Sequence, residues 1–160
     1  MNSFNLENVL FIHTAYLRQY EKIICICVGK LNLQDPIYLN LRSFYNDDED
    51  KLLLEFKSFL DRFPRETMLC ASTGIHREYP LIQQKMLSNN IEIPSILKST
   101  PEFVSDAITD NETDLQLEYL EDNDSDMIVQ HCMYRVVALA QVILRFNNLR
   151  RVSTENIYYV

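Results

Sequence analysis

Short apolar runs separated by turn-forming residues predict a β-sheet in the first part of the chain. Residues 9–12 and 23–28 are apolar runs of strand length, as expected for strands buried on both faces. Residues 36–45 alternate between apolar and polar side chains, which predicts a third strand with one covered face. Gly29 and residues 32–36 favour turns. The short spacing between the three strands therefore favours an antiparallel meander.

A helix and a fourth strand are predicted next. Acidic residues at 46–50 crowd the first turn of the helix, where its dipole favours negative charge, and Pro64 ends it. Residues 67–71 form another short apolar run. A strand reached through a helical crossover is expected to lie parallel to its neighbour in the sheet. The apolar stripe of the helix consists of Leu52, Leu53, Phe56, Phe59, Leu60 and Phe63.

The second half of the chain is predicted to be mainly helical. One helix has Pro80 in its first turn and is closed by Asn89. Weaker patterns suggest short helices at 103–108 and 115–120, and the tail at 152–160 is expected to pack back on the body. The last helix has the clearest apolar periodicity, with Val129, Cys132, Val136, Leu139, Ile143 and Phe146 on one face. Together these elements predict one α/β domain over residues 1–160, with a mixed sheet flanked by helices.

Charge is distributed unevenly along this domain. The net charge is −8, but residues 102–126 hold ten acids and no Lys or Arg, so the remainder is close to neutral. We therefore expect an acidic segment at about 100–125. It is interpreted as a solvated loop, as an interaction segment for a basic partner, or as a decoy that resembles nucleic acid.

Composition argues against several classes of protein. Two glycines leave no room for a Gly-rich phosphate-binding loop. No apolar run approaches the ~20 residues of a membrane span, and the N-terminus has no basic and apolar leader. The four cysteines sit in apolar surroundings without a CxxC pair, which predicts reduced, buried thiols in a cytoplasmic protein. Cys25 and Cys27 share a strand face, but no further cluster is spaced to complete a zinc site.

The order of predicted elements resembles a ribonuclease-H-like domain: a three-strand meander, a helix, a parallel strand, a helix, a connector and a long helix. Local strings are similar to a group of predicted bacterial 3′–5′ exonucleases that is related to the proofreading domain of family-B DNA polymerases. The resemblance covers most of the chain. The strings that carry it are residues 9–12, 23–29, 42–45, 70–86, 128–146 and 157–160.

The resemblance implies a site for two-metal phosphodiester hydrolysis, in which four carboxylates hold two Mg²⁺ or Mn²⁺ ions. The first two acids, an Asp-x-Glu after strand one, fall on His13 and Ala15 of this chain. The third, at the start of a helix after strand four, falls on Glu78. The fourth, on the last helix, falls on Arg135, with His131 at the water-orienting position one turn earlier. Only one of the four carboxylates is therefore retained.

This donor set predicts that two-metal catalysis is lost. Mg²⁺ and Mn²⁺ need several oxygen ligands, whereas these positions offer one carboxylate, one imidazole and one fixed cation. Glu78 and His13 would be the ligands if any ion bound, and Arg135 is expected to pair with Glu78. The chain is also truncated relative to the family after Ala15 and between residues 97 and 125. We therefore expect no cofactor.

The resulting hypothesis is a catalytically inactive exonuclease-like domain that acts as a binding or structural module, with another protein as its partner and no membrane association. The alternative is a residual or rewired nuclease, dependent on Mg²⁺ or Mn²⁺ and acting on single-stranded nucleic acid, in which Glu78 works with His13, His76 and His131. A third interpretation is nucleic-acid binding without catalysis, which would show steep salt dependence. The run Asp122-x-Asp124-x-Asp126 begins like a calcium loop but lacks the required Gly and Glu.

Overall fold

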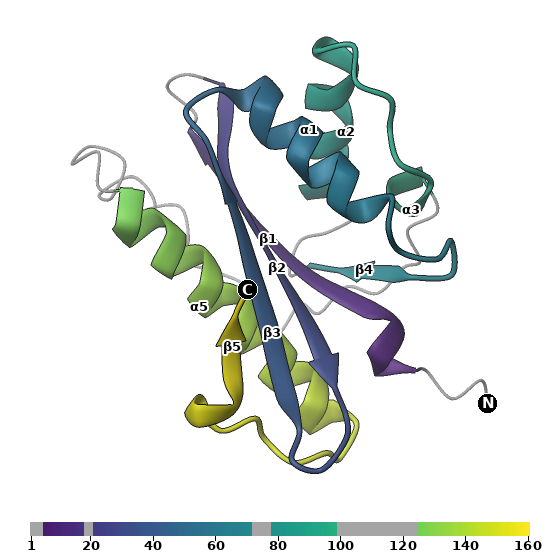
Figure 1. Cartoon of the computed structure of the whole chain (residues 1–160), viewed down its shortest axis with the longest axis vertical. Helices are drawn as coiled ribbons and strands as arrows, with labels where there is room; N and C mark the ends of the chain where they lie inside the picture. The colour runs from purple at the N-terminus through teal and green to yellow at the C-terminus, as the bar shows by residue number, and fades with distance from the viewer. Residues whose placement is uncertain (1–4, 18–20, 72–77, 99–124) are drawn as a thin grey trace.

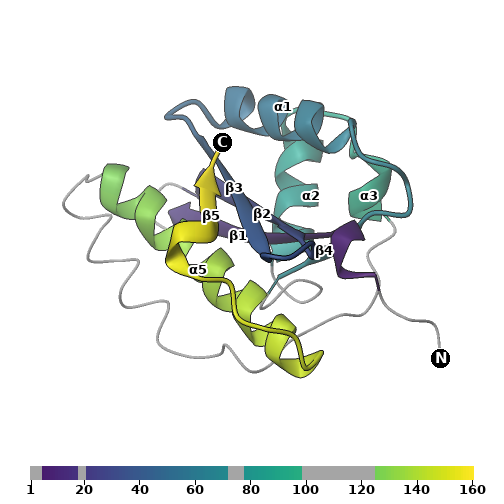
Figure 2. The same ribbon diagram turned by 60° about the horizontal axis from the view of Figure 1, so that its bottom comes forward.

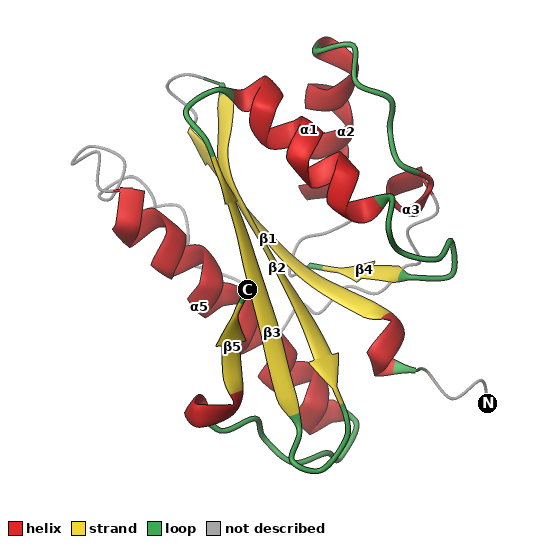
Figure 3. Cartoon of the chain, viewed as in Figure 1, coloured by secondary structure: helices red, strands yellow, loops and turns green. Residues whose placement is uncertain are grey.

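A five-stranded mixed sheet forms the centre of the structure, in the order β4-β1-β2-β3-β5 (Figure 1; Figure 3). The computed structural model describes residues 5–17, 21–71, 78–98 and 125–160. Strands β1 to β3 form the expected antiparallel meander, while β4 pairs parallel with β1, and β5 pairs parallel with β3. The strands are β1 (Val9–Leu17), β2 (Lys22–Asn32), β3 (Tyr38–Tyr45), β4 (Met68–Cys70) and β5 (Ile157–Tyr159).

Helices cover both faces of this sheet, as Figure 2 shows from its end. Three helices lie on one face: α1 (Glu49–Leu60), α2 (Tyr79–Ser88) and the single-turn α3 (Ser95–Lys98). The long helix α5 (Ser125–Phe146) lies on the other face. Two single-turn 3-10 helices, Leu6–Asn8 and Thr154–Asn156, precede β1 and β5. The α/β class and the mixed sheet flanked by helices are thus confirmed.

Alternation along the strands divides the apolar core into two parts. On β1, Leu10 and Ile12 contact the side of α1 and α2, whereas Val9 and Phe11 contact the side of α5. The same alternation holds on β3 and on β2, except that Ile24 and Cys25 both pack on the α5 side, where the pairing with β1 is irregular. Each face of the sheet therefore supplies one continuous apolar layer. The sheet is therefore covered on both faces, as the two-sided apolar runs predict.

Helix α1 begins as its sequence predicts, but it ends at Leu60, so Phe63 of the predicted stripe lies beyond the helix. The side chain of Asp48 accepts a hydrogen bond from the backbone N–H of Asp50 at 3.1 Å, and acids occupy the first turn. The helix ends ahead of Pro64. Phe59 and Phe63, at the end of the apolar stripe, are only partly buried and stack edge-on at 5.0 Å between ring centroids.

Helix α5 buries one face against β1, β2 and β3, with Cys132, Val136, Leu139 and Ile143 among its buried residues. Phe146 was expected on this face but is 69% exposed; it is the last residue of the helix. By length and composition alone, α5 is the one helix of the described residues that meets the criteria for a membrane span. A core helix meets the same criteria.

Gly29 lies inside β2, so the expected turn at this position is wrong. A Cβ atom there would lie 2.6 Å from Cγ1 of Val136 on α5, which is closer than side chains approach one another. The glycine therefore allows the helix to approach the sheet closely. The turn falls instead after Asn32, where β2 ends.

The tail packs on the body as expected, and it does so as a strand. β5 extends the sheet beside β3, and the backbone N–H of Val160 donates to the carbonyl of Leu41 at 2.8 Å. The rings of Tyr158 and Tyr38 meet edge-on, with 5.7 Å between their centroids. The helices expected at 103–108 and 115–120 lie outside the described residues.

Candidate functional site

The candidate site lies where β1 extends past its short neighbour β4. The last paired residue of β4, Cys70, lies opposite Phe11, yet β1 continues as far as Leu17. The expectation that the strand ends before His13 is therefore wrong. The polar residues stay in the strand because β2 pairs with them on the other side, with Cys27 opposite His13. Beyond Phe11, the edge of β1 that faces β4 needs another hydrogen-bonding partner.

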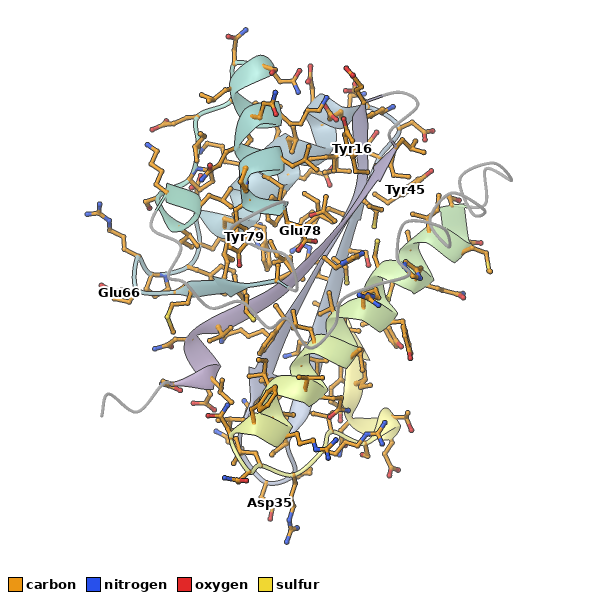
Figure 4. The ribbon with its side chains drawn as sticks, turned by 180° about the vertical axis from the view of Figure 1, so that it is seen from behind. Tyr16, Asp35, Tyr45, Glu66, Glu78 and Tyr79 are labelled. Carbon is orange, nitrogen blue, oxygen red and sulfur yellow. The ribbon has the colours of Figure 1, made fainter. Side chains whose placement is uncertain are left out.

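Glu78 provides that partner. Its Oε1 atom accepts a hydrogen bond from the backbone N–H of Thr14 at 2.9 Å, and both residues are buried. Glu78 immediately precedes α2, but its side chain makes no capping hydrogen bond to that helix. Figure 4 shows Glu78 and Tyr79 at the start of α2, beside the sheet. The carboxylate thus ties the beginning of α2 to the open edge of β1.

His13 lies against the same carboxylate. Its Nδ1 atom is 3.5 Å from Oε1 of Glu78, and only 4% of each residue is exposed. The interaction is an ion pair when the imidazole is protonated. The ring of His131 on α5 meets the His13 ring edge-on, with 6.1 Å between centroids and 75° between planes. Three elements, β1, α2 and α5, therefore meet at His13.

Burial and the neighbouring charge of Arg135 lower the pKa of His131 below its ordinary value of 6.5. The two residues lie one turn apart on α5, as their spacing predicts. His131 is therefore predominantly neutral near pH 7. The ion pair between Arg135 and Glu78 that the sequence suggests stays a prediction.

Two further residues that the sequence singles out are Ala15 and His76. Ala15 is buried in the core on the α5 side of β1, opposite Cys25, so its methyl group fills apolar space. His76 lies outside the described residues. The structure thus brings together His13, Glu78 and His131, and it leaves Ala15 with a packing role.

Cysteines surround this cluster, which sequence reasoning did not foresee. Cys25 and Cys27 share the α5 face as predicted, and all four cysteines are buried and free of disulfides. Burial raises the pKa of Cys27 to about 12, while burial and the negative charge of Glu78 raise that of Cys70 to about 12. A hydrogen bond with Cys25, together with burial, also raises the pKa of Cys132. These thiols therefore stay protonated near neutral pH, unlike nucleophilic or metal-binding cysteines.

The chemistry available at the cluster is that of one carboxylate and two imidazoles. Within the described ranges, no three His, Cys, Asp or Glu side chains are arranged to hold a metal ion. Glu78 and His13 together offer one oxygen and one nitrogen donor. A carboxylate beside an imidazole can orient that ring and move its proton, as general acid–base sites do.

Comparison with known proteins adds no family to this description. No protein-family model matches the chain, and no curated protein matches it.

Proposed function

We propose that this chain is a catalytically inactive 3′–5′ exonuclease-like domain that serves as a binding or structural module, with another protein as its partner. The observation that carries the proposal is the set of contacts made by Glu78, the one carboxylate retained from the family pattern. Its Oε1 atom is held by the backbone N–H of Thr14 and by His13. The group that would bind metal in an active relative is engaged within the fold itself.

The arrangement of the sheet supports the family assignment. The strand order β4-β1-β2-β3, with an antiparallel meander and β4 parallel to β1, agrees with the ribonuclease-H-like order that the resemblance implies. The long helix α5 brings His131 against His13, on the part of β1 that extends past β4. Glu78 comes immediately before α2, the helix that follows β4.

The donor set supports the loss of catalysis. Two-metal hydrolysis uses oxygen ligands that hold two divalent cations a few Å apart. Ala15 supplies no ligand, His13 supplies nitrogen in place of oxygen, and Arg135 brings a positive charge to the helix face that would carry the fourth acid. These residues do not fit a pair of Mg²⁺ or Mn²⁺ ions. We further propose a cytoplasmic location, which the four free thiols support.

One observation favours the alternative of a rewired nuclease acting on single-stranded nucleic acid. His13 lies beside the Glu78 carboxylate, and the ring of His131, whose pKa is lowered, meets the His13 ring edge-on. A neutral imidazole such as that of His131 can accept a proton, and a carboxylate can orient the imidazole beside it. Catalysis of this kind would depend on Glu78.

A nuclease assay separates the two candidates. Purified protein is incubated with single-stranded DNA or RNA and Mn²⁺, beside Glu78→Gln, which keeps an acceptor oxygen but no charge. Glu66→Gln is the matched control because Glu66 is exposed, away from the cluster (Figure 4). The proposal expects no degradation by any of the three proteins. Degradation that Glu78→Gln abolishes and Glu66→Gln retains would establish the enzyme instead.

A further inference from the structure

A groove lies between α5 and the C-terminal segment. It has a volume of about 1030 Å³ and is lined by one face of α5, by residues 151–154, and by Ile157 and Tyr159. Its floor is apolar, since Met133, Val137 and Ile157 pack on the core beneath it. Tyr134 and Tyr159 line it with side chains that are 69% and 70% exposed. Apolar surface that lies open in this way is characteristic of binding sites.

One wall of the groove is the open edge of the sheet. Among the strands that the structure describes, β5 is the terminal one, and it pairs with β3 alone. The N–H of Val160 bonds to Leu41, so the alternation of strand geometry directs the N–H and C=O of Tyr159 away from β3. These groups face the edge that no described strand covers. An extended peptide can add to such an edge as a further strand and place alternate side chains in the groove.

The charge of the groove indicates which peptide would fit. Among the described residues of its lining, Arg151 is the one that is charged, and an adjoining hollow of about 320 Å³ is lined by Arg145 together with Arg151. Both arginines are exposed, and none of the described residues that line the two hollows is acidic. Arg145 and Arg151 form a positive rim, which is a local exception in a chain whose net charge is −8. Positive charge beside an apolar floor is complementary to a segment that combines acidic and apolar residues.

We propose that this groove binds an extended peptide segment of another protein, added as a strand to the β5 edge, with apolar side chains over Val137 and Ile157 and acidic side chains beside Arg145 and Arg151. The inference deepens the proposed binding role and rests on it for the nature of the partner. It uses none of the residues of the His13–Glu78 cluster.

Two synthetic peptides test the groove by fluorescence anisotropy with the full chain. In the first peptide Asp and Val alternate, and in the second Lys replaces Asp. The acidic peptide is expected to bind, and the basic peptide to bind at least about tenfold more weakly, because its charges oppose the arginines. Failure of the acidic peptide to bind, or equal binding of both, overturns the proposal.

Variants locate the binding. Arg151→Glu reverses the charge at the rim. Arg62→Glu makes the same change at an exposed site just after α1, the helix on the face of the sheet opposite α5. Arg151→Glu is expected to weaken binding about tenfold, while Arg62→Glu leaves it unchanged. Equal effects of the two variants would contradict the assignment to the groove.

A backbone variant tests strand addition. Tyr159→Pro removes an N–H that points away from β3, so the pairing with β3 is retained. Tyr159→Ala is the control, because it also removes the ring that lines the groove but keeps that N–H. The proline variant is expected to weaken binding about tenfold, with far-ultraviolet circular dichroism unchanged. Unchanged affinity would overturn strand addition. A concentration-dependent dimer that Tyr159→Pro abolishes would assign the edge to a second copy of this chain and overturn the peptide.

These outcomes are independent of the nuclease assay. If the peptide fails to bind while the protein also fails to degrade nucleic acid, the groove inference is lost and the inactive domain is retained. If degradation depends on Glu78, the proposed function is lost whatever the peptide does.

Discussion

Glu78 accepts a hydrogen bond from the backbone N–H of Thr14, and this bond joins two segments that are 64 residues apart in the chain. The bond completes the edge of β1 at the point where β4 has ended. A buried strand edge requires a partner for each N–H group, and here a carboxylate takes the role that another strand residue would have. The same oxygen lies 3.5 Å from His13 Nδ1, so one side chain both supports the fold and defines the candidate site.

Replacing Glu78 should therefore cost stability. Glu78→Ala leaves the Thr14 N–H buried without this acceptor, and we expect a loss of about 1–3 kcal/mol in the free energy of unfolding. Glu78→Gln keeps an acceptor oxygen and should cost less. Urea unfolding measures both variants, with Glu66→Ala at an exposed position as the control. A Glu78→Ala variant as stable as that control would contradict the structural role.

Replacing Gly29 by a residue with a side chain should push α5 away from the sheet. The Cβ of Gly29→Ala would lie 2.6 Å from Val136 Cγ1 and 3.2 Å from methyl groups of Leu39 and Leu41. We expect a loss of about 1–3 kcal/mol from overpacking, measured by urea unfolding. Adding Val136→Ala should recover part of this loss, since it removes the closest atom, and a double-mutant cycle isolates the coupling. Additive effects of the two changes would show that the contact is not the cause.

The lowered pKa of His131 predicts an acid-sensitive fold. Below its ordinary pKa of 6.5, the unfolded chain takes up a proton at this residue more readily than the folded chain. The contribution of His131 to the free energy of unfolding is therefore fully present above pH 6.5 and is lost as the pH falls below that value. The free energy of unfolding at pH 7.5 and 5.5 should differ less in His131→Asn than in the unchanged protein. An equal difference in the two proteins would remove His131 as the cause.

The cysteines should react only after the structure opens. All four are buried, and the raised pKa values of Cys27 and Cys70, about 12, keep these thiols protonated at neutral pH. An aromatic disulfide reagent should therefore modify the native protein slowly and the unfolded protein rapidly, with four thiols released for reaction. Rapid stoichiometric labelling of one native thiol would show that a cysteine is accessible and activated.

Strands and helices with a regular spacing of buried apolar side chains could be predicted from the sequence. The two-sided apolar run of β2 and the stripe of α1 are local signals, because burial selects side chains at a fixed period. Gly29 failed as a turn because its role depends on Val136, a residue on a distant helix. The strand character of residues 157–159 was likewise hidden, since a short edge strand is determined by the neighbour with which it pairs.

The candidate site, too, could be predicted only in part. Because family resemblance aligned His13, Glu78 and His131, their meeting could be expected. The bond from Thr14 to Glu78 could not, because it depends on β4 being too short to cover β1. The proximity of Cys70 and Cys27 to the cluster depends in turn on strand register, which apolar composition does not determine.

The pairing of β5 with β3 also has a consequence for the order of folding. Leu39 pairs with Ile157, so this contact closes a much longer loop than the meander or the pairing of β1 with β4. Closure of a long loop costs more chain entropy and is slow. We expect β5 to join a sheet whose other four strands are already assembled. Pulsed hydrogen exchange during refolding should therefore protect the amide of Val160 after those of β2, and the seam between β3 and β5 should be the first to open again.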